Sequence, residues 1–380
     1  MMASLDRGAG SPVSRGTLAR RGSAESNQGS ESSDGGCEHS TVSAKARLSE
    51  RTGGPTIPRA SQPVVSVCIP TFNRRGYLTE AVESVLAQSF GDFELVISDN
   101  ASTDDTAEVV LSFGDPRIRY SRNDRNIGAP ANWLNAVTKA IGRYCVIIGD
   151  DDRWAPTLLE RLVPPLDDNP DVDVAFSDHW LIDADGCVLA ARSNRCSQDY
   201  GRVSLQPGRH KPFLDLALHA QALLTTCALI RKESMLSLGA LDPQAGGVAL
   251  DYYLFARIAL AGRGAFYVPG RLAYYRVHPR SGSARHQVQV WQDMQRICAY
   301  LVHYVPAGRH ETKIRRRWAR ALANEGVALL HESDRSGAIR ALGRSLRMAP
   351  FTVRPWLALG AAAVFGSWPP FRGLTTPEEV

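Results

Sequence analysis

Residues 65–106 read VSVCIPTFNRRGYLTEAVESVLAQSFGDFELVISDNASTDDT, and this stretch decides the fold class. Its two apolar runs, at 64–70 and 93–99, have the length and the β-branched content of buried strands. Between them, apolar residues spaced four apart from Tyr77 to Val85 form one face of a helix. Strand, helix and strand at this spacing predict a βαβ unit and therefore a parallel sheet.

The same alternation continues along the chain. We expect a helix to begin at Thr103, where Ser102 and Asp105 resemble a capping arrangement, and a further helix over 133–141. The expected fold class is α/β, with a Rossmann-like, mainly parallel sheet and flanking helices. The remaining strand candidates are 118–122, 144–150 and 172–178.

Three of the five strand candidates end in a carboxylate, at Asp99, Asp150 and Asp178. Ligands of open parallel sheets bind outside the carboxyl ends of the strands. We therefore expect these carboxylates to meet in one crevice. No GxGxxG motif follows the first strand and no P-loop motif occurs anywhere in the sequence. These absences argue against a dinucleotide-binding enzyme and a P-loop NTPase.

The fourth strand candidate runs into three adjacent aspartates, Asp150, Asp151 and Asp152. Adjacent carboxylates repel one another and are rarely buried without a partner. One interpretation is a site for Mg²⁺ or Mn²⁺, which are usually bound by one or two carboxylates together with substrate phosphates. The other is a solvated acidic turn that caps a helix at about 156–162.

The composition is that of an ordinary globular protein. Its 380 residues include 44 basic and 39 acidic ones, and the net charge of +5 alone does not indicate nucleic acid as a partner. Seven cysteines show no CxxC pair, so we expect a reducing, cytoplasmic environment. No run reaches the roughly 18 apolar residues of a membrane span, and the first residues lack the apolar core of a secretory signal.

Three stretches together resemble one known family. They are the opening stretch at 65–106, NIGAPANWLNAV at 126–137 and IIGDDDRWAP at 147–156. In order and spacing they resemble the nucleotide-sugar domain of family 2 glycosyltransferases, which have the GT-A fold, and the resemblance extends from 64 to about 280. It implies transfer of a sugar from a nucleoside-diphosphate sugar, usually with inversion at the anomeric carbon and usually with Mg²⁺ or Mn²⁺.

The resemblance also implies which residues bind the donor. Pro70, Thr71 and Phe72 would border the base, with Phe72 standing where the family commonly has tyrosine. Asp99 matches an aspartate that contacts the base or the ribose. Asn100 follows it where the family often has a second acidic residue.

Two further donor-binding segments follow from the same resemblance. Asn126 and Gly128 match a turn beside the nucleotide, although Gly128 alone is equally typical of a turn that enters a helix. The stretch YYRVHP at 274–279 also matches the family, and its His278 would bind the diphosphate or the metal. A structural histidine is the alternative.

The aspartate triplet stands where the family has its metal-binding DXD motif, and two registers are open. In the favoured register, Asp150 faces the ribose and Asp152 binds the metal, so that both belong to the metal site. If the first family aspartate aligns with Gly149 instead, Asp151 carries the metal.

The second half must supply the acceptor site and a general base, because an inverting transfer needs a group that takes the proton of the attacking hydroxyl. The family has a Glu-Asp pair before an aromatic helix, and this chain has Leu250 and Asp251. Asp251 is therefore the candidate catalytic base. The alternative is an ordinary helix N-terminal carboxylate, favoured by the helix dipole.

The remainder of the chain is expected to be helical. Residues 309–347 carry ten basic and four acidic side chains. Their pattern of alanine and leucine residues resembles one degenerate tetratricopeptide-like helix pair. A basic helical face beside the apolar stretch 356–366 is compatible with peripheral contact with the inner face of a membrane or with a lipid-linked acceptor. A solvated basic face is the plainer interpretation.

The sequence thus predicts three parts and one activity. Residues 1–60 lack aromatic residues and are expected to be disordered. They precede a GT-A domain at 61–283, with a nucleotide-sugar half at 61–178 and an acceptor half at 179–283, and a helical extension at 284–380. The expected activity is metal-dependent, inverting transfer of a sugar to an acceptor hydroxyl, in the assembly of a surface polysaccharide or another glycan. Alternatives are a sugar nucleotidyltransferase and a non-catalytic nucleotide-sugar binding protein.

Overall fold

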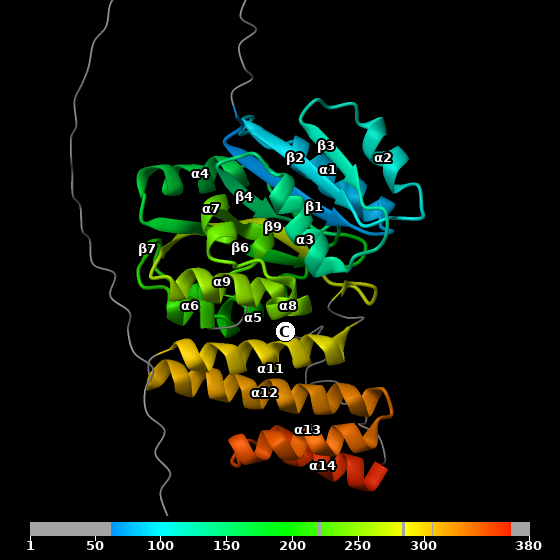
Figure 1. Ribbon diagram of the computed structural model, residues 1–380, viewed down its shortest axis with the longest axis vertical. Helices are drawn as coiled ribbons and strands as arrows, with labels where there is room; N and C mark the ends of the chain where they lie inside the picture. Colours follow the sequence, from blue (N-terminus) through cyan, green and yellow to red (C-terminus); the bar gives the residue numbers. More distant parts are fainter. Residues whose placement is uncertain (1–61, 219–221, 283–285, 306, 366–380) are drawn as a thin grey trace, which may run out of the picture. The chain divides into compact units, whose positions relative to one another are not determined.

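A computed structural model describes residues 62–218, 222–282, 286–305 and 307–365. Its first strands form the parallel part of one sheet, in the order β3-β2-β1-β4 (Figure 1). Every residue of β2 is buried, as the apolar run predicts. These strands are β1 (Val65–Thr71), β2 (Phe93–Asp99), β3 (Ile118–Arg122) and β4 (Tyr144–Ile147).

The sheet continues beyond β4 as a mixed sheet. Strand β8 is antiparallel to both β4 and β6, and β9 is parallel to β6. Two short strands, β5 and β7, pair antiparallel with β9. The second part of the sheet is β5 (Arg153–Trp154), β6 (Val172–Ile182), β7 (Gly208–His210), β8 (Ala228–Arg231) and β9 (Gly264–Arg276).

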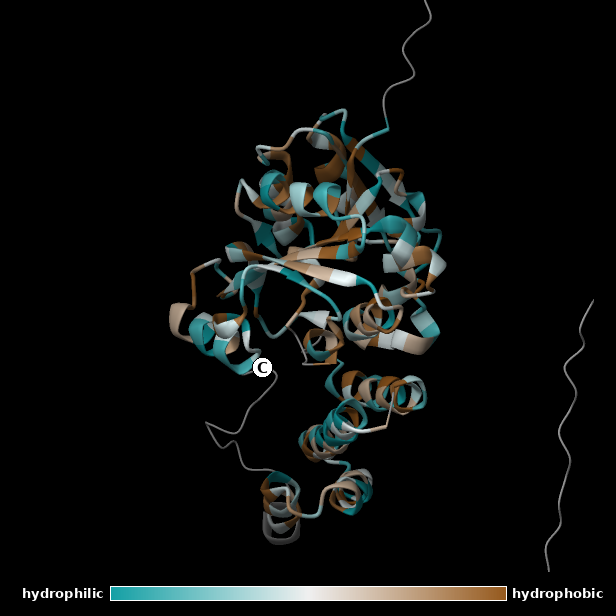
Figure 2. Cartoon of the chain, turned by 90° about the vertical axis from the view of Figure 1, so that its left-hand side faces the viewer, coloured by the Kyte–Doolittle hydropathy of each residue, from teal (hydrophilic) through white to brown (hydrophobic). Residues whose placement is uncertain are grey.

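Helices cover the sheet, and the buried apolar residues form one large cluster on each of its sides. Figure 2 shows hydrophobic residues along much of the central sheet. Helices α1 and α4 contribute to one cluster, and α3 and α9 to the other. The helices are α1 (Arg75–Leu86), α2 (Thr106–Ser112), α3 (Ala129–Lys139), α4 (Leu158–Asp168), α5 (Ala190–Asp199), α6 (Leu214–Leu218), α7 (Lys232–Ser237), α8 (Pro243–Gly246) and α9 (Leu250–Leu260), with short 3-10 turns η1 (Arg202–Ser204), η2 (Thr225–Cys227) and η3 (Gly247–Ala249).

All five strand candidates form strands, but three local predictions are wrong. Strand β4 ends at Ile147 rather than at Asp150, so Asp150 lies in the turn after it. Helix α2 begins at Thr106 rather than at Thr103, because the Ser102 hydroxyl accepts a hydrogen bond from the backbone N–H of Asn73 (2.9 Å) and does not cap a helix. Asp178 lies inside β6 and not at the end of a strand, because the strand runs on to Ile182.

The helices that the structure describes from Gln287 onward pack one upon the next, as Figure 1 shows. They are α11 (Gln287–Tyr304), α12 (Arg309–His331), α13 (Arg335–Met348) and α14 (Val353–Phe365). Helix α11 contacts α8 and α9, and α12 contacts α6. In the described residues, no helix has the length and apolar character needed to span a membrane. The disorder expected for 1–60 lies outside the described residues.

Candidate functional site

The end of β1 meets Asp150 in the turn that follows β4. Thr71, buried at the end of β1, donates a hydrogen bond from Oγ1 to Asp150 Oδ2 (2.8 Å), and the N–H of Phe72 approaches the same oxygen (3.4 Å). The Phe72 ring is 40% exposed, so it is free to contact a ligand. Pro70 precedes them in β1, beside Ser98 of β2.

The positive partner of the acidic turn is Arg74. Its Nη1 contacts the Asp151 carboxylate and lies 3.5 Å from Asp150 Oδ1. The same nitrogen is 3.4 Å from Nε2 of His278, which is itself 3.0 Å from Asp151 Oδ2. The structure therefore brings Asp150, Asp151 and His278 together, across a large distance in sequence.

The pKa values of Asp150 and Asp151 are shifted in opposite directions. Burial, reinforced by the charge of Asp151, raises the pKa of Asp150 to about 6. Burial also acts on Asp151, but the hydrogen bond from His278 and the charge of Arg74 outweigh it and lower the pKa of Asp151. Asp151 is thus the more strongly anionic of the two.

Asp152 has a different environment. It is 1% exposed, and its two oxygens accept hydrogen bonds from Thr226 Oγ1 (2.5 Å) and from the backbone N–H of Arg276 (2.9 Å). Burial, with the charge of Asp151, raises its pKa to about 8. Since both oxygens are engaged by the chain, this arrangement disfavours Asp152 as a metal ligand and favours the register in which Asp151 carries the metal.

Arg276, at the end of β9, holds the acidic turn in place, a role that the sequence did not indicate. Its side chain is buried, and Nε donates to the carbonyl oxygen of Asp151 (2.7 Å). Nη2 binds Glu80 of α1 (2.6 Å), and the guanidinium lies over the Tyr77 ring at 4.6 Å. The motif YYRVHP contains Arg276, but nothing local shows which segment it contacts.

Asp99 is fully buried at the end of β2. Its Oδ1 accepts the N–H of Ser102 (2.9 Å) and its Oδ2 the hydroxyl of Tyr120 (2.7 Å), while Arg122 Nε lies 3.6 Å away. Asp99 therefore orders the strand ends around it. Any contact with a base or ribose would have to be made alongside these partners.

Asn100 links β2 to the segment that contains Asn126 and Gly128. Its Nδ2 donates to Asn126 Oδ1 (2.8 Å), and its Oδ1 accepts the N–H of Ile127 (2.9 Å). Asn126 Oδ1 also accepts the N–H of Gly128 (2.9 Å), which has φ +85° and immediately precedes α3. Gly128 is thus a helix-entry residue held beside the strand ends.

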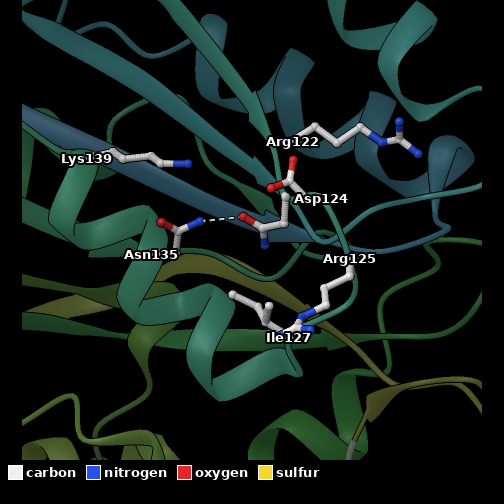
Figure 3. A pocket seen from close by; sticks show the side chains of 7 residues that line it. Arg122, Asp124, Arg125, Ile127, Asn135 and Lys139 are labelled. Carbon is white, nitrogen blue, oxygen red and sulfur yellow. Dashed lines mark hydrogen bonds between the residues drawn. The ribbon is translucent and has the colours of Figure 1, made fainter.

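A hollow of about 490 Å³ lies next to this segment (Figure 3). Asn135 projects toward it from α3 and donates to Asn123 Oδ1 (2.6 Å). Three of its lining side chains are cationic and one is anionic. The lining residues are Arg122, Asn123, Asp124, Arg125, Ile127, Asn135 and Lys139.

Asp251 lies in the first turn of α9. Its Oδ1 accepts the N–H of Tyr252 (2.7 Å), and burial raises the pKa of the carboxyl, opposed in part by the charge of Arg317. Arg317 belongs to α12 and lies over the Tyr252 ring at 4.3 Å. Within the described part of the chain, no hydrogen bond or ion pair joins Asp251 to the acidic turn.

Asp178 does not join the site. It is buried in β6, where it pairs with Arg202 Nε (2.9 Å) and lies 3.4 Å from Arg271 Nε. Among the described residues, no set of three or more His, Cys, Asp or Glu side chains could hold a metal ion. Any ion at Asp151 and His278 would therefore need oxygen ligands from outside the chain.

Residues 66–236 match the family model described as glycosyl transferase family 2. These residues form a family 2 glycosyltransferase domain. The sheet agrees with the GT-A fold: residues 1–349 of S. aureus TarS, in complex with UDP-GlcNAc, align with a TM-score of 0.57 over 75% of this chain and 81% of that one, at 18% identity.

Two curated relatives are similar over shorter stretches. Abequosyltransferase RfbV of Salmonella typhimurium is 43% identical over 29% of this chain. A Campylobacter jejuni protein, GalNAc(5)-diNAcBac-PP-undecaprenol beta-1,3-glucosyltransferase, is 38% identical over 27% of it. The aligned part is 34% of each relative, so the chain matches about a third of their length.

Proposed function

We propose that the protein is a metal-dependent, inverting glycosyltransferase that moves a sugar from a nucleoside-diphosphate sugar to an acceptor hydroxyl. The main support for the proposal is that Asp150, Asp151 and His278 lie together in a chain that contains a family 2 domain. They lie at the carboxyl ends of the parallel strands, where Thr71 binds Asp150. An anionic cluster at this edge suits a cation bound together with a diphosphate.

Asp151 and His278 are the proposed metal ligands. Their Oδ2 and Nε2 atoms, 3.0 Å apart, offer one carboxylate and one imidazole, and Mg²⁺ or Mn²⁺ characteristically adds phosphate oxygens and water to such a pair. When bound, the ion neutralises the diphosphate and stabilises it as a leaving group. Asp150, held by Thr71, is left to face the ribose.

The donor base is proposed to lie between the ends of β1 and β2. Pro70 and the exposed Phe72 ring border it on one side, and Asp99 on the other. Asn126 and Gly128, fixed by Asn100, form the adjoining wall. Base stacking on an aromatic ring and hydrogen bonds to Asp99 would then fix the orientation of the donor.

Asp251 is the proposed general base. A buried carboxyl whose pKa is raised is a better proton acceptor than an exposed one. It would take the proton of the acceptor hydroxyl as that oxygen attacks the anomeric carbon from the side opposite the diphosphate, which inverts the configuration. Leu250, which stands before Asp251, is 3% exposed and packs in the core, so it contacts no acceptor.

The proposed setting is the assembly of a surface polysaccharide or another glycan at the cytoplasmic face of a membrane. Support comes from the Campylobacter jejuni relative, whose name describes a lipid-linked, undecaprenol-bearing molecule. The acceptor class is therefore a glycan or a lipid-linked glycan. Peripheral membrane contact would be made by the helices after the sheet.

The decisive test combines donor binding with turnover. Thermal stabilisation by UDP-, GDP- and dTDP-sugars is measured with Mn²⁺ and with EDTA; a shift that requires Mn²⁺ is expected for one base. Asp251→Asn should keep this shift and lose turnover by about 10²- to 10⁴-fold. The matched control is Asp242→Asn, which alters an aspartate that caps α8. No shift with any donor would contradict the proposal, and full turnover of Asp251→Asn would favour a different base.

A further inference from the structure

Arg74 lies where a metal ion would be expected. It immediately precedes α1 and reaches the acidic turn, so that its Nη1 has the Asp151 carboxylate, Asp150 Oδ1 (3.5 Å) and His278 Nε2 (3.4 Å) around it. Its Nη2 donates to the carbonyl oxygen of Arg280 (2.7 Å). One guanidinium nitrogen thus has the same carboxylate and imidazole as neighbours that a divalent cation would bind.

Both cations cannot use these atoms at once. A metal ion coordinated by Asp151 and His278 needs the Asp151 lone pairs that face Arg74 and replaces the proton through which His278 Nε2 hydrogen-bonds Asp151, the proton passing to solvent. Two positive charges a few ångströms apart repel strongly in a site that water scarcely enters. The Arg74 side chain is 17% exposed, and that of Asp151 is 14% exposed. The guanidinium must therefore leave when an ion enters.

We propose that Arg74 is an exchangeable counter-ion: it neutralises the acidic turn in the donor-free protein, and the metal displaces it onto the donor's diphosphate. The proposal rests on the metal site of the proposed function. A released guanidinium beside the site is suited to a diphosphate, because its planar fork binds phosphate oxygens in pairs. The long side chain can turn from the carboxylates to the phosphates without movement of α1.

The exchange couples the metal to the nucleotide. Without a diphosphate, the ion must displace Arg74 from Asp151, and the displaced guanidinium has no new partner. The metal alone therefore binds weakly. With a diphosphate present, the displaced guanidinium acquires a new partner, and each ligand strengthens binding of the other by the same factor. Arg74 then acts in positioning the donor, and it also prevents the acidic turn from holding stray cations.

The test measures Mn²⁺ binding to the full-length protein, by the electron paramagnetic resonance signal of free Mn²⁺, without nucleotide and with UDP or GDP. Arg74→Met should bind Mn²⁺ alone at least about fivefold more tightly than the unaltered protein. It should also lose most of the gain that the nucleotide confers. Arg74→Lys, which keeps the charge, should retain weak binding of Mn²⁺ alone. Arg75→Met is the control, because Arg75 is exposed and pairs with Asp105.

Each outcome separates this inference from the proposed function. Circular dichroism first shows that Arg74→Met is folded. If this variant then binds Mn²⁺ alone no more tightly than the unaltered protein, the exchange is overturned, but the proposed metal site is not. If no variant binds Mn²⁺ with or without nucleotide, the exchange is also overturned. Nucleotide binding in EDTA then shows whether donor recognition survives without a metal.

Discussion

The backbone N–H of Arg276 donates to Asp152 Oδ1 at 2.9 Å, and the Arg276 side chain donates from Nε to the carbonyl oxygen of Asp151 at 2.7 Å. The end of β9 is thereby joined twice to the turn that follows β4. The first of these bonds occupies an Asp152 oxygen, whereas the second uses only the backbone of Asp151 and leaves its carboxylate to Arg74 and His278. The three aspartates therefore divide into a structural residue and two that face the site.

This division predicts opposite effects for two neighbouring substitutions. Asp151→Asn removes the proposed metal carboxylate and should lower kcat/KM and Mn²⁺ affinity by about 100-fold or more, with little change in stability. Asp152→Asn keeps a hydrogen-bond acceptor for Arg276 and should cost about 1 kcal/mol of folding stability, with less than a tenfold loss of Mn²⁺ affinity. Mn²⁺ titration and chemical denaturation of both variants measure this; the reverse pattern would restore Asp152 as the metal ligand.

Asp251 predicts a dependence of activity on pH. A general base must be ionised, and burial raises the pKa of Asp251, so the acid limb of the kcat/KM profile should lie above the ordinary carboxyl value of about 3.9. The charge of Arg317 opposes that rise, and Arg317→Met should therefore move the limb to still higher pH. Activity would be lost at a pH where the unaltered enzyme still works.

The control for this prediction is Arg316→Met, on the same helix. Arg316 is exposed and does not act on Asp251, so its removal should leave the acid limb where it is. A limb that does not move in Arg317→Met would show either that Arg317 does not act on the base or that another group titrates. Asp251→Asn distinguishes these two cases, because the acid limb disappears from the pH profile only when the base that produces it is removed.

The Asn100–Asn126 hydrogen bond predicts an effect on donor binding. Asn100→Asp replaces the amide donor with an oxygen that faces Asn126 Oδ1, so the segment at 123–128 loses this bond while the other oxygen still accepts the N–H of Ile127. We expect the donor KM to rise about tenfold with kcat little changed, which corresponds to one lost hydrogen bond of about 1.4 kcal/mol. A double-mutant cycle with Asn126→Ala measures the coupling, and additive effects would show that the bond is irrelevant.

The sequence predicted the features that depend on local periodicity. The runs at 64–70 and 93–99 form β1 and β2, and the apolar face from Tyr77 to Val85 packs on them. A buried strand or helix face needs apolar residues at its own spacing, and that spacing can be seen in the sequence alone. The end of β6 was placed wrongly, since 179–182 could extend the strand or leave it, and only pairing with β9 decides that.

The partners of the site residues could not be predicted in the same way. Arg74 and Asp151 are 77 positions apart, and the Arg276 side chain meets the Asp151 carbonyl across 125 positions. Neither contact follows from a repeat or a propensity. The register of the three aspartates also stayed open, because their roles depend on Thr226, from the turn before β8, and on Arg276, from β9.

The C-terminal helices predict binding to anionic membranes. Phe351 is 97% exposed, and Val353, Trp356 and Leu357 of α14 are more than half exposed, so an apolar surface faces solvent. In the part of the chain that the structure describes, no carboxylate pairs with a set of exposed arginines on α12 and α13. Uncompensated cations beside exposed aromatic residues suit an anionic lipid surface. The set is Arg316, Arg320, Arg344 and Arg347.

Vesicle co-sedimentation tests this with phosphatidylcholine alone and with added phosphatidylglycerol. The protein should bind only the anionic vesicles, and Arg344→Gln with Arg347→Gln should weaken binding about tenfold or more, because each arginine near such a surface contributes about 1 kcal/mol. Phe351→Ser with Trp356→Ser should weaken it further, whereas Leu111→Ser, an exposed apolar residue of α2, should not. Because salt screens the arginines, on which the binding to anionic vesicles depends, 0.5 M NaCl should abolish most binding; equal recovery with both vesicle types would refute the electrostatic contact.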